Sequence, residues 1–361
     1  MNYRQLIADS WFFTQNNKRL IIWFGCVPAT FEIIGGILFV GYQYFATKKS
    51  ELFDYHGPSF LSEIGNFVWN FIKVDPGLGI TLAVAAGIVF LLYLTLPTLF
   101  QCATIQFIAR RRNKQDVTLG DGMKHGIFSF LPLIEYHAII KIFGFFWLLT
   151  ESAFILRNLG VDAFRMVGAI FLIVFLFGLL LSLLFTYTPF YIVIDRKEVM
   201  RSVVASSKLV ILNLTHTFLV TILMVIIGLR IVVQLVIVLS IPAIILFFGG
   251  YLATTVLAGA GYIIGGVLGF IALLFAIYFA GIIEIFANSV WVFTFLEITE
   301  KRELSARENE QKKTLGTRHV MLEEGTDYEV ADVDQLSEHR EEDDPRHAPH
   351  QLPEHHEEDD Y

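Results

Sequence analysis

The fold is decided by two long apolar stretches near the end of the chain. Residues 217–248 read TFLVTILMVIIGLRIVVQLVIVLSIPAIILFF, and residues 263–296 read IIGGVLGFIALLFAIYFAGIIEIFANSVWVFTFL. The interior of this region, from Thr217 to Glu297, contains only two charged residues, Arg230 and Glu284. An apolar run of about 18 residues or more is long enough to cross the hydrocarbon core of a bilayer as a helix. The region therefore predicts membrane-spanning helices.

The composition extends this prediction to the whole chain. Hydrophobic residues make up 55% of the 361 residues, and the mean hydropathy is +0.58. Backbone groups in lipid must be hydrogen-bonded within the chain, so the apolar runs are expected to be helices. The predicted fold is an all-α, polytopic transmembrane helical bundle with amphipathic helices at the membrane surface. The six expected spans are residues 20–46, 79–109, 131–156, 167–194, 217–248 and 263–296.

Several shorter segments carry the pattern of surface helices. Residues 3–15 and 60–72 place apolar side chains on one helical face, and Ser59 is a candidate N-cap for the second of these. Residues 115–130 are a further candidate. Residues 196–215 combine valines with lysine and arginine, which is typical of a helix at the membrane surface, and Asp195 is expected to cap it.

The distribution of lysine and arginine predicts the orientation. The N-terminus, the 109–125 loop, the 195–216 loop and residues 299–318 contain 3, 5, 4 and 6 of these residues. The loops 46–78, 157–166 and 249–262 contain 3, 2 and 0. Because cytoplasmic loops are enriched in positive charge, both termini are expected in the cytoplasm. A third crossing within residues 217–296, broken at Pro242 and Gly261, is an alternative that places the tail outside.

The charge pattern divides the chain in two. Residues 1–298 contain 19 Lys and Arg against 15 Asp and Glu, whereas residues 299–361 contain 8 against 20. The first part is the predicted transmembrane domain. The second part lacks apolar periodicity and is expected to be a disordered, acidic, His-rich cytoplasmic tail. His347, His350, His355 and His356 lie in it without the fixed spacing of a metal site.

Three charged residues are expected at a similar depth in the membrane. Glu32, Arg230 and Glu284 each lie about 13 residues from the cytoplasmic end of their span, roughly 20 Å at the helical rise. An unpaired charge at this depth is costly, so an ion pair between Arg230 and a glutamate is expected. A structural pair that fixes the helix register is the simpler interpretation. A substrate or proton site is the functional one.

Two other residue sets are candidates for packing and for lipid contact. Gly261, Gly265 and Gly269 recur every four residues, a spacing that lets membrane helices approach closely. The basic loops face the anionic leaflet, either as topology determinants or as phospholipid head-group contacts. The candidate head-group residues are Arg110, Arg111, Arg112, Arg196, Lys197, Arg201 and Lys208.

No catalytic pattern is found in the sequence. It lacks a glycine-rich phosphate loop, HExxH and GxSxG. Cys26 and Cys102 lie within expected spans and are interpreted as small buried side chains rather than as a disulfide or metal pair. We expect no catalytic residue, no metal and no cofactor. Glu135, His137 and Lys141, which interrupt the third span, are the candidates if the protein is a membrane-embedded enzyme.

One segment resembles a known family. Residues 185–213, FTYTPFYIVIDRKEVMRSVVASSKLVILN, join an aromatic, proline-containing span end to a short charged turn and a surface helix. This pattern resembles the membrane domain of bacterial glycerophosphoryl diester phosphodiesterases and of related stand-alone six-helix bacterial membrane proteins, most clearly over residues 170–230. The resemblance implies a bacterial plasma (inner) membrane location and a link to lipid. It implies no enzymatic activity, because the family's soluble catalytic domain has no counterpart here.

These observations favour a non-enzymatic integral membrane protein that associates with membrane lipids or organises a membrane partner. A transporter with a charged site at Glu32, Arg230 and Glu284 is the alternative, although no internal repeat supports it. A protein partner could bind the cytoplasmic tail, and nucleic acid is not an expected partner. The ligand and the oligomeric state are not determined by the sequence.

Overall fold

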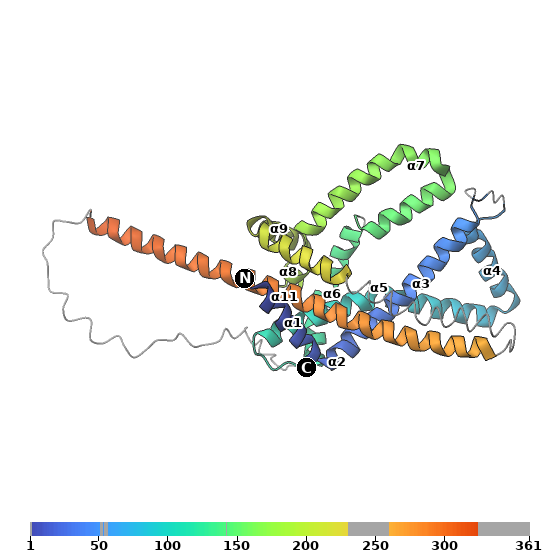
Figure 1. The fold of residues 1–361 in the computed structure, drawn as a ribbon, viewed down its shortest axis with the longest axis horizontal. Coiled ribbons are helices and arrows are strands. Elements are labelled where there is room, and N and C mark those ends of the chain that lie inside the picture. The colour runs from blue at the N-terminus through green and yellow to red at the C-terminus, as the bar shows by residue number, and fades with distance from the viewer. Residues whose placement is uncertain (1, 51–52, 54–56, 142, 230–259, 324–361) are drawn as a thin grey trace, which may run out of the picture. The chain divides into compact units, whose positions relative to one another are not determined.

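The structure is a computed structural model that describes residues 2–50, 53, 57–141, 143–229 and 260–323. Its chain divides into two compact units, Met1–Lys301 and Arg302–Tyr361. The described residues form helices and no strand, which confirms the all-α prediction (Figure 1).

The first unit begins with helices around the N-terminal span. α1 (Tyr3–Asn16) precedes a short α2 (Lys18–Leu20), a π-helical turn η1 (Ile21–Cys26) and α3 (Val27–Lys48). The helices that follow are α4 (Phe60–Val74), α5 (Pro76–Arg112), α6 (Leu119–Lys141), α7 (Phe145–Leu184), α8 (Thr188–Val193), α9 (Val199–Leu212), a helix over Leu214–Leu229, and α11 (Ala260–Glu323).

Among the described residues, four helical stretches are long and apolar enough to cross a membrane. They are Lys18–Lys48, Pro76–Arg112, Trp147–Leu184 and Gly269–Ser305. A fifth candidate is the pair Val199–Leu212 and Leu214–Leu229, which meets at a bend of 97°. The exposed side chains of the first half of α5, from Leu78 to Leu94, are almost all apolar. Such a surface is expected where a helix faces lipid, so the fold is that of a membrane protein.

The expected spans 20–46 and 79–109 each lie within one of these long stretches, but the next two expected spans differ from the observed helices. α6 begins at Leu119 and ends at Lys141, inside the expected span 131–156. α7 covers the rest of that span, the expected loop 157–166 and most of the span 167–194. Helix therefore continues through most of the segment expected to be a loop.

α7 turns back on itself at Gly160. This glycine has φ 81° and ψ 177°, a conformation that is essentially restricted to glycine. The chain on its two sides meets again, because the Phe143 ring packs edge-on against Phe177 at 6.1 Å. A Cβ atom on Gly178 would lie 2.5 Å from the Phe143 carbonyl oxygen. Figure 1 shows the sharp turn between the two arms of α7.

The helix starts follow local capping chemistry. The Ser59 hydroxyl accepts a hydrogen bond from the Ser62 N–H, which confirms the predicted N-cap of α4. Asp75 caps α5 in the same way, with Pro76 in the first turn. The expectation that Asp195 caps α9 is wrong. α9 begins only at Val199, and the Asp195 carboxylate instead accepts from Lys197 Nζ at 2.8 Å.

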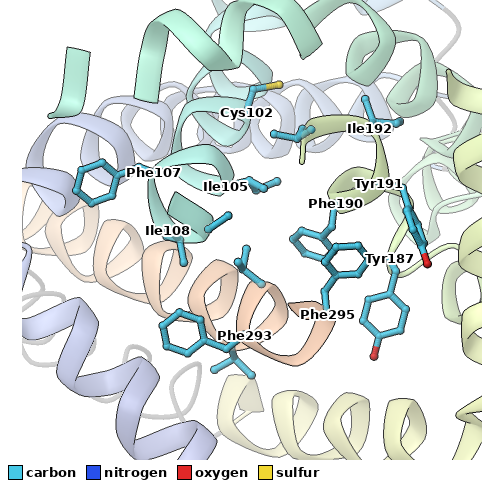
Figure 2. Close-up of a cluster of buried hydrophobic side chains, with 14 of the residues drawn as sticks. Cys102, Ile105, Phe107, Ile108, Tyr187, Phe190, Tyr191, Ile192, Phe293 and Phe295 are labelled. Carbon is cyan, nitrogen blue, oxygen red and sulfur yellow. The ribbon is translucent and has the colours of Figure 1, made fainter. Parts of the chain in front are cut away.

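The buried core gathers the second half of α5 with α8, α9 and residues 285–298 of α11. Aromatic rings dominate it: Phe295 contacts Tyr191 edge-on at 4.9 Å and Phe190 at 5.8 Å (Figure 2). α6 joins this core closely, because a Cβ atom on Gly126 would lie 2.7 Å from the Ala103 backbone nitrogen. The tight packing lies at the end of α5 that carries the arginines.

The expected tail is partly helical. α11 continues through residues 299–323, the first part of the tail expected to be disordered, and residues 324–361 lie outside the described residues. Glu, Lys, Arg and Gln are strong helix formers, and they dominate this stretch. Lys301 also pairs with Glu297 one turn earlier at 3.0 Å. The absence of an apolar face excludes a buried helix but does not exclude a solvated one.

Candidate functional site

The turn between α7 and α9 is held by a single buried hydroxyl group. Ser206 of α9 donates to the Leu184 carbonyl at 2.8 Å, and its oxygen accepts from the Tyr187 N–H at 3.1 Å. These are backbone groups that the break before Pro189 leaves without helical partners. Tyr187 also hydrogen-bonds Thr217 at 3.2 Å. Residues 185–213, which carry the family resemblance, are thus held together by these hydrogen bonds.

This unit is tied to the end of α5. The buried Gln106 side chain donates from its amide nitrogen to the Val193 carbonyl at the end of α8. Its amide oxygen accepts from Arg110 Nε at 3.3 Å. Arg110 is therefore fixed beside the turn that leads to α9, although the two segments are more than eighty residues apart in the sequence.

Arg196 occupies that turn in a left-handed conformation, with φ 51°. A positive φ is uncommon for arginine and is strained. The guanidinium lies 5.5 Å from the ring centroid of Phe128 on α6. Lys197 turns instead toward Tyr191, with its ammonium 4.4 Å from that ring centroid. The strained backbone thus directs the Arg196 side chain toward α6.

Arg110, His125 and Arg196 form what we call the basic cluster, with one residue each from α5, α6 and the α8–α9 turn. Partial burial lowers the pKa of His125, and the positive charges of Arg110 and then Arg196 lower it further. Arg110 and Arg196 also interact with each other. Like charges that interact in this way repel, so the cluster is suited to an anion.

One carboxylate partly offsets the cluster. Asp121 on α6 interacts with both Arg110 and His125. It is fully engaged with its own helix start, accepting from the Thr118 N–H at 3.0 Å and the Thr118 hydroxyl at 2.6 Å, and these bonds lower the Asp121 pKa. Its charge is therefore directed to the helix N-terminus as well as to the arginines.

The other predicted head-group residues have separate partners. Arg111 pairs with Asp116 at 3.1 Å, and Arg201 with Glu198 at 3.4 Å, both on the exposed surface. Arg112 donates to the Phe293 carbonyl of α11 at 2.6 Å and lies 4.8 Å from the Phe293 ring centroid. Lys208 is exposed on α9. Arg112 is thus a structural link between α5 and α11.

Two of the three predicted buried charges lie near each other. Glu32 of α3 and Glu284 of α11 are close enough for their charges to interact, and Cys26 interacts with Glu284 as well. Arg230 lies outside the described residues, so its pairing stays a prediction. Cys26, the last residue of the π-helical turn η1, interacts with Glu284, and such turns are frequent at functional sites.

Of the remaining candidates, those that the structure describes are not brought together. Glu135 is exposed, His137 Nε2 hydrogen-bonds the Gln101 oxygen at 2.9 Å, and the Lys141 side chain lies outside the described part. A Cβ atom on Gly269 would meet no described atom within 4 Å. The surroundings of Gly261 and Gly265 lie outside the described part of α11. The close helix approach among the described residues of α11 is instead at Gly281.

The comparisons with known proteins identify no relative. No family model matches the chain, and no curated protein and no solved structure matches it. Sequence reasoning had included Arg110 and Arg196 but not His125 or Gln106. The cluster of charges at residues 121–125 was a local signal for His125, whereas nothing near Gln106 in the sequence indicates its bond to α8.

Proposed function

We propose that this protein is a non-enzymatic, multi-pass membrane protein that binds anionic lipid at its cytoplasmic surface through the basic cluster. The observation that carries the proposal is that Gln106 ties Arg110 to the end of α8, beside the turn of Arg196, and that Arg196 packs over Phe128, one turn from His125 on α6. Phosphate groups are bound well by arginine, because its planar fork can donate two parallel hydrogen bonds.

The surface around the cluster supports a membrane contact. α9 buries Ser202, Ser206 and Leu209 and exposes Met200, Val204 and Ile211. Arg201 and Lys208 are exposed on the same helix. A helix that exposes apolar and basic side chains together is suited to the interface, where the apolar groups enter the acyl region and the cations reach the phosphates.

The finer topology belongs to this proposal. Six crossings require that α6 and the first arm of α7 together form one broken span, and that residues 217–248 cross once. Both termini then lie in the cytoplasm, as the lysine and arginine counts favour. The resemblance over residues 170–230 supports a bacterial plasma membrane location. Docking of a protein partner by the acidic tail is compatible with the same arrangement.

Native mass spectrometry of the protein in mild detergent tests the lipid proposal. We expect the wild-type protein to retain phosphatidylglycerol in preference to phosphatidylcholine. Arg196→Gln should reduce this retention several-fold, whereas Arg165→Gln, which removes an equal charge from an exposed pair with Asp162 on α7, should change it little. Equal losses in both variants would exclude the basic cluster as the site. A wild-type protein that retains no anionic lipid would exclude the lipid role.

The approach of Glu32 to Glu284 supports transport as a second candidate function. Two carboxylates at one depth in a membrane can share a proton or pair with Arg230. If Arg230 pairs with Glu284, Arg230→Ala destabilises the protein and adding Glu284→Gln partly restores its melting temperature.

If the carboxylates carry protons, vesicles containing the wild-type protein should dissipate a pH gradient and those with Glu284→Gln should not. If neither effect is observed, the transport function has no support.

A further inference from the structure

A cavity outside the basic cluster lies at the C-terminal end of α3. This cavity of about 550 Å³ opens between the end of α3, the start of α4 and the first arm of α7. Its described lining includes the aromatic residues Tyr42, Phe60 and Phe154 and the cations Lys49 and Arg157. A cavity of this size is within the range of small-molecule sites.

Arg157 has a buried hydrogen-bond donor with no acceptor among the described residues. Its guanidinium carbon lies near two rings, 5.7 Å from the Tyr42 centroid and 5.9 Å from the Phe154 centroid. These contacts hold the group in place through cation–π attraction. Its Nη1 atom is buried, and no described residue accepts a hydrogen bond from it. A buried N–H group without an acceptor is costly, most of all on a charged group.

The second cation of the cavity is already neutralised. Lys49 Nζ forms an ion pair with Glu63 of α4 and lies 6.0 Å from the Phe60 ring centroid. This pair ties the end of α3 to α4 and shapes one wall. The positive charge left for a ligand is therefore that of Arg157, since no ion pair joins Arg157 to a described carboxylate.

The wall next to the cavity is apolar and uncovered. α4 has no buried residue among those described, and Leu61, which lines the cavity, is 65% exposed. Ile64, Phe67 and Val68 continue the exposed apolar surface along the helix. A ligand that places an anion on Arg157 can therefore lay an apolar chain along α4.

We propose that this cavity binds the phosphate of an anionic amphiphile, with Arg157 as the phosphate ligand and α4 as the surface for its acyl chain. Free phosphate shares the head-group chemistry but makes no use of α4. The inference keeps the lipid class of the proposed function but uses none of the residues of the basic cluster. The two sites can therefore fail separately.

The experiment is calorimetric titration of the full-length protein in detergent, in an Arg196→Gln background that removes a cation of the basic cluster. The three probes are dihexanoyl phosphatidylglycerol, dihexanoyl phosphatidylcholine and inorganic phosphate. Arg157→Gln should weaken phosphatidylglycerol binding about tenfold or more, the loss expected for a charge-assisted bond. The matched control Arg165→Gln lies in the same helix, where Arg165 is exposed and pairs with Asp162, and should change nothing.

Each outcome decides the proposal. If inorganic phosphate binds as tightly as phosphatidylglycerol and Arg157→Gln abolishes this binding, the site is one for a soluble anion. The proposed role of α4 as the surface for the acyl chain is then overturned. If phosphatidylcholine binds as well as phosphatidylglycerol, or if Arg157→Gln leaves phosphatidylglycerol binding unchanged, the proposed site is overturned. If Arg157→Gln does not elute as a folded species, Arg157→Lys replaces it. Lysine keeps the charge without the fork, so several-fold weaker binding is expected and unchanged affinity would overturn the proposal.

Discussion

Gly25 and Gly281 bring the backbones of two helical segments into direct contact. A Cβ atom on Gly25 would lie 2.6 Å from the Gly281 carbonyl oxygen, and one on Gly281 would lie 2.8 Å from the Cys26 backbone nitrogen. Close approach of this kind replaces the hydrophobic driving force that is absent between helices in lipid. It also sets Glu32 and Glu284 near each other, because each lies about two turns or less from the crossing.

Gly281→Ala should therefore destabilise the protein. The atoms nearest to the new methyl group are two backbone atoms and Cys26 Sγ, so the helices must separate, at a cost of about 1–3 kcal/mol. The melting temperature in detergent measures this. Gly36→Ala is the control, because a methyl group there meets nothing within 4 Å among the described residues. Equal melting temperatures for the two variants would contradict the close crossing.

Ser206→Ala tests the lock between α7, α8 and α9. The change leaves the Leu184 carbonyl and the Tyr187 N–H without their shared partner in a buried site, and each such loss costs about 1–3 kcal/mol. We expect a clear fall in melting temperature. Ser207→Ala is the control, since that hydroxyl bonds only the Val203 carbonyl of its own helix. A fall of similar size in Ser207→Ala would show that the lock is not specific.

Gly160→Ala tests the turn of α7. Alanine strongly disfavours φ 81°, ψ 177°, so the variant should lose about 1–3 kcal/mol or straighten the turn. Gly168→Ala lies in regular helix with open space around it and should stabilise the protein by roughly 0.5–1 kcal/mol. Opposite signs in thermal unfolding are expected. Stabilisation by both changes would mean that α7 continues through Gly160 as a single helix.

His125 should make stability depend on pH. Its pKa in the folded protein is lowered by burial and by Arg110 and Arg196, so the unfolded chain binds the proton more tightly. Stability is therefore retained above the ordinary histidine pKa of about 6.5 and is lost as the pH falls below it. His125→Gln should reduce the loss of melting temperature on acidification. A bound anion should raise the His125 pKa, which NMR titration of the ring can detect. If the melting temperature of His125→Gln depends on pH in the same way as that of the wild-type protein, His125 does not belong to the basic cluster.

The sequence by itself determined the class of fold and several local features. Runs of apolar residues longer than the bilayer is thick specify helices, because no other backbone arrangement satisfies its hydrogen bonds in lipid. The spans at residues 20–46 and 79–109 and the N-cap Ser59 followed from periodicity and capping chemistry alone. These properties depend on neighbours within one or two turns, so a single chain segment contains the information.

Only the tertiary structure decided which residues meet. The bond of Gln106 to Val193, the approach of Arg110 to Arg196 and the contact of Gly25 with Gly281 join positions that are distant in the sequence. Glycines at 261, 265 and 269 carried the stronger sequence pattern, yet the close crossing among the described residues of α11 is at Gly281. The depth of a side chain in the membrane can be counted from the end of its span. Which other helix faces that side chain depends on packing between segments that are distant in the sequence, so no single segment specifies it.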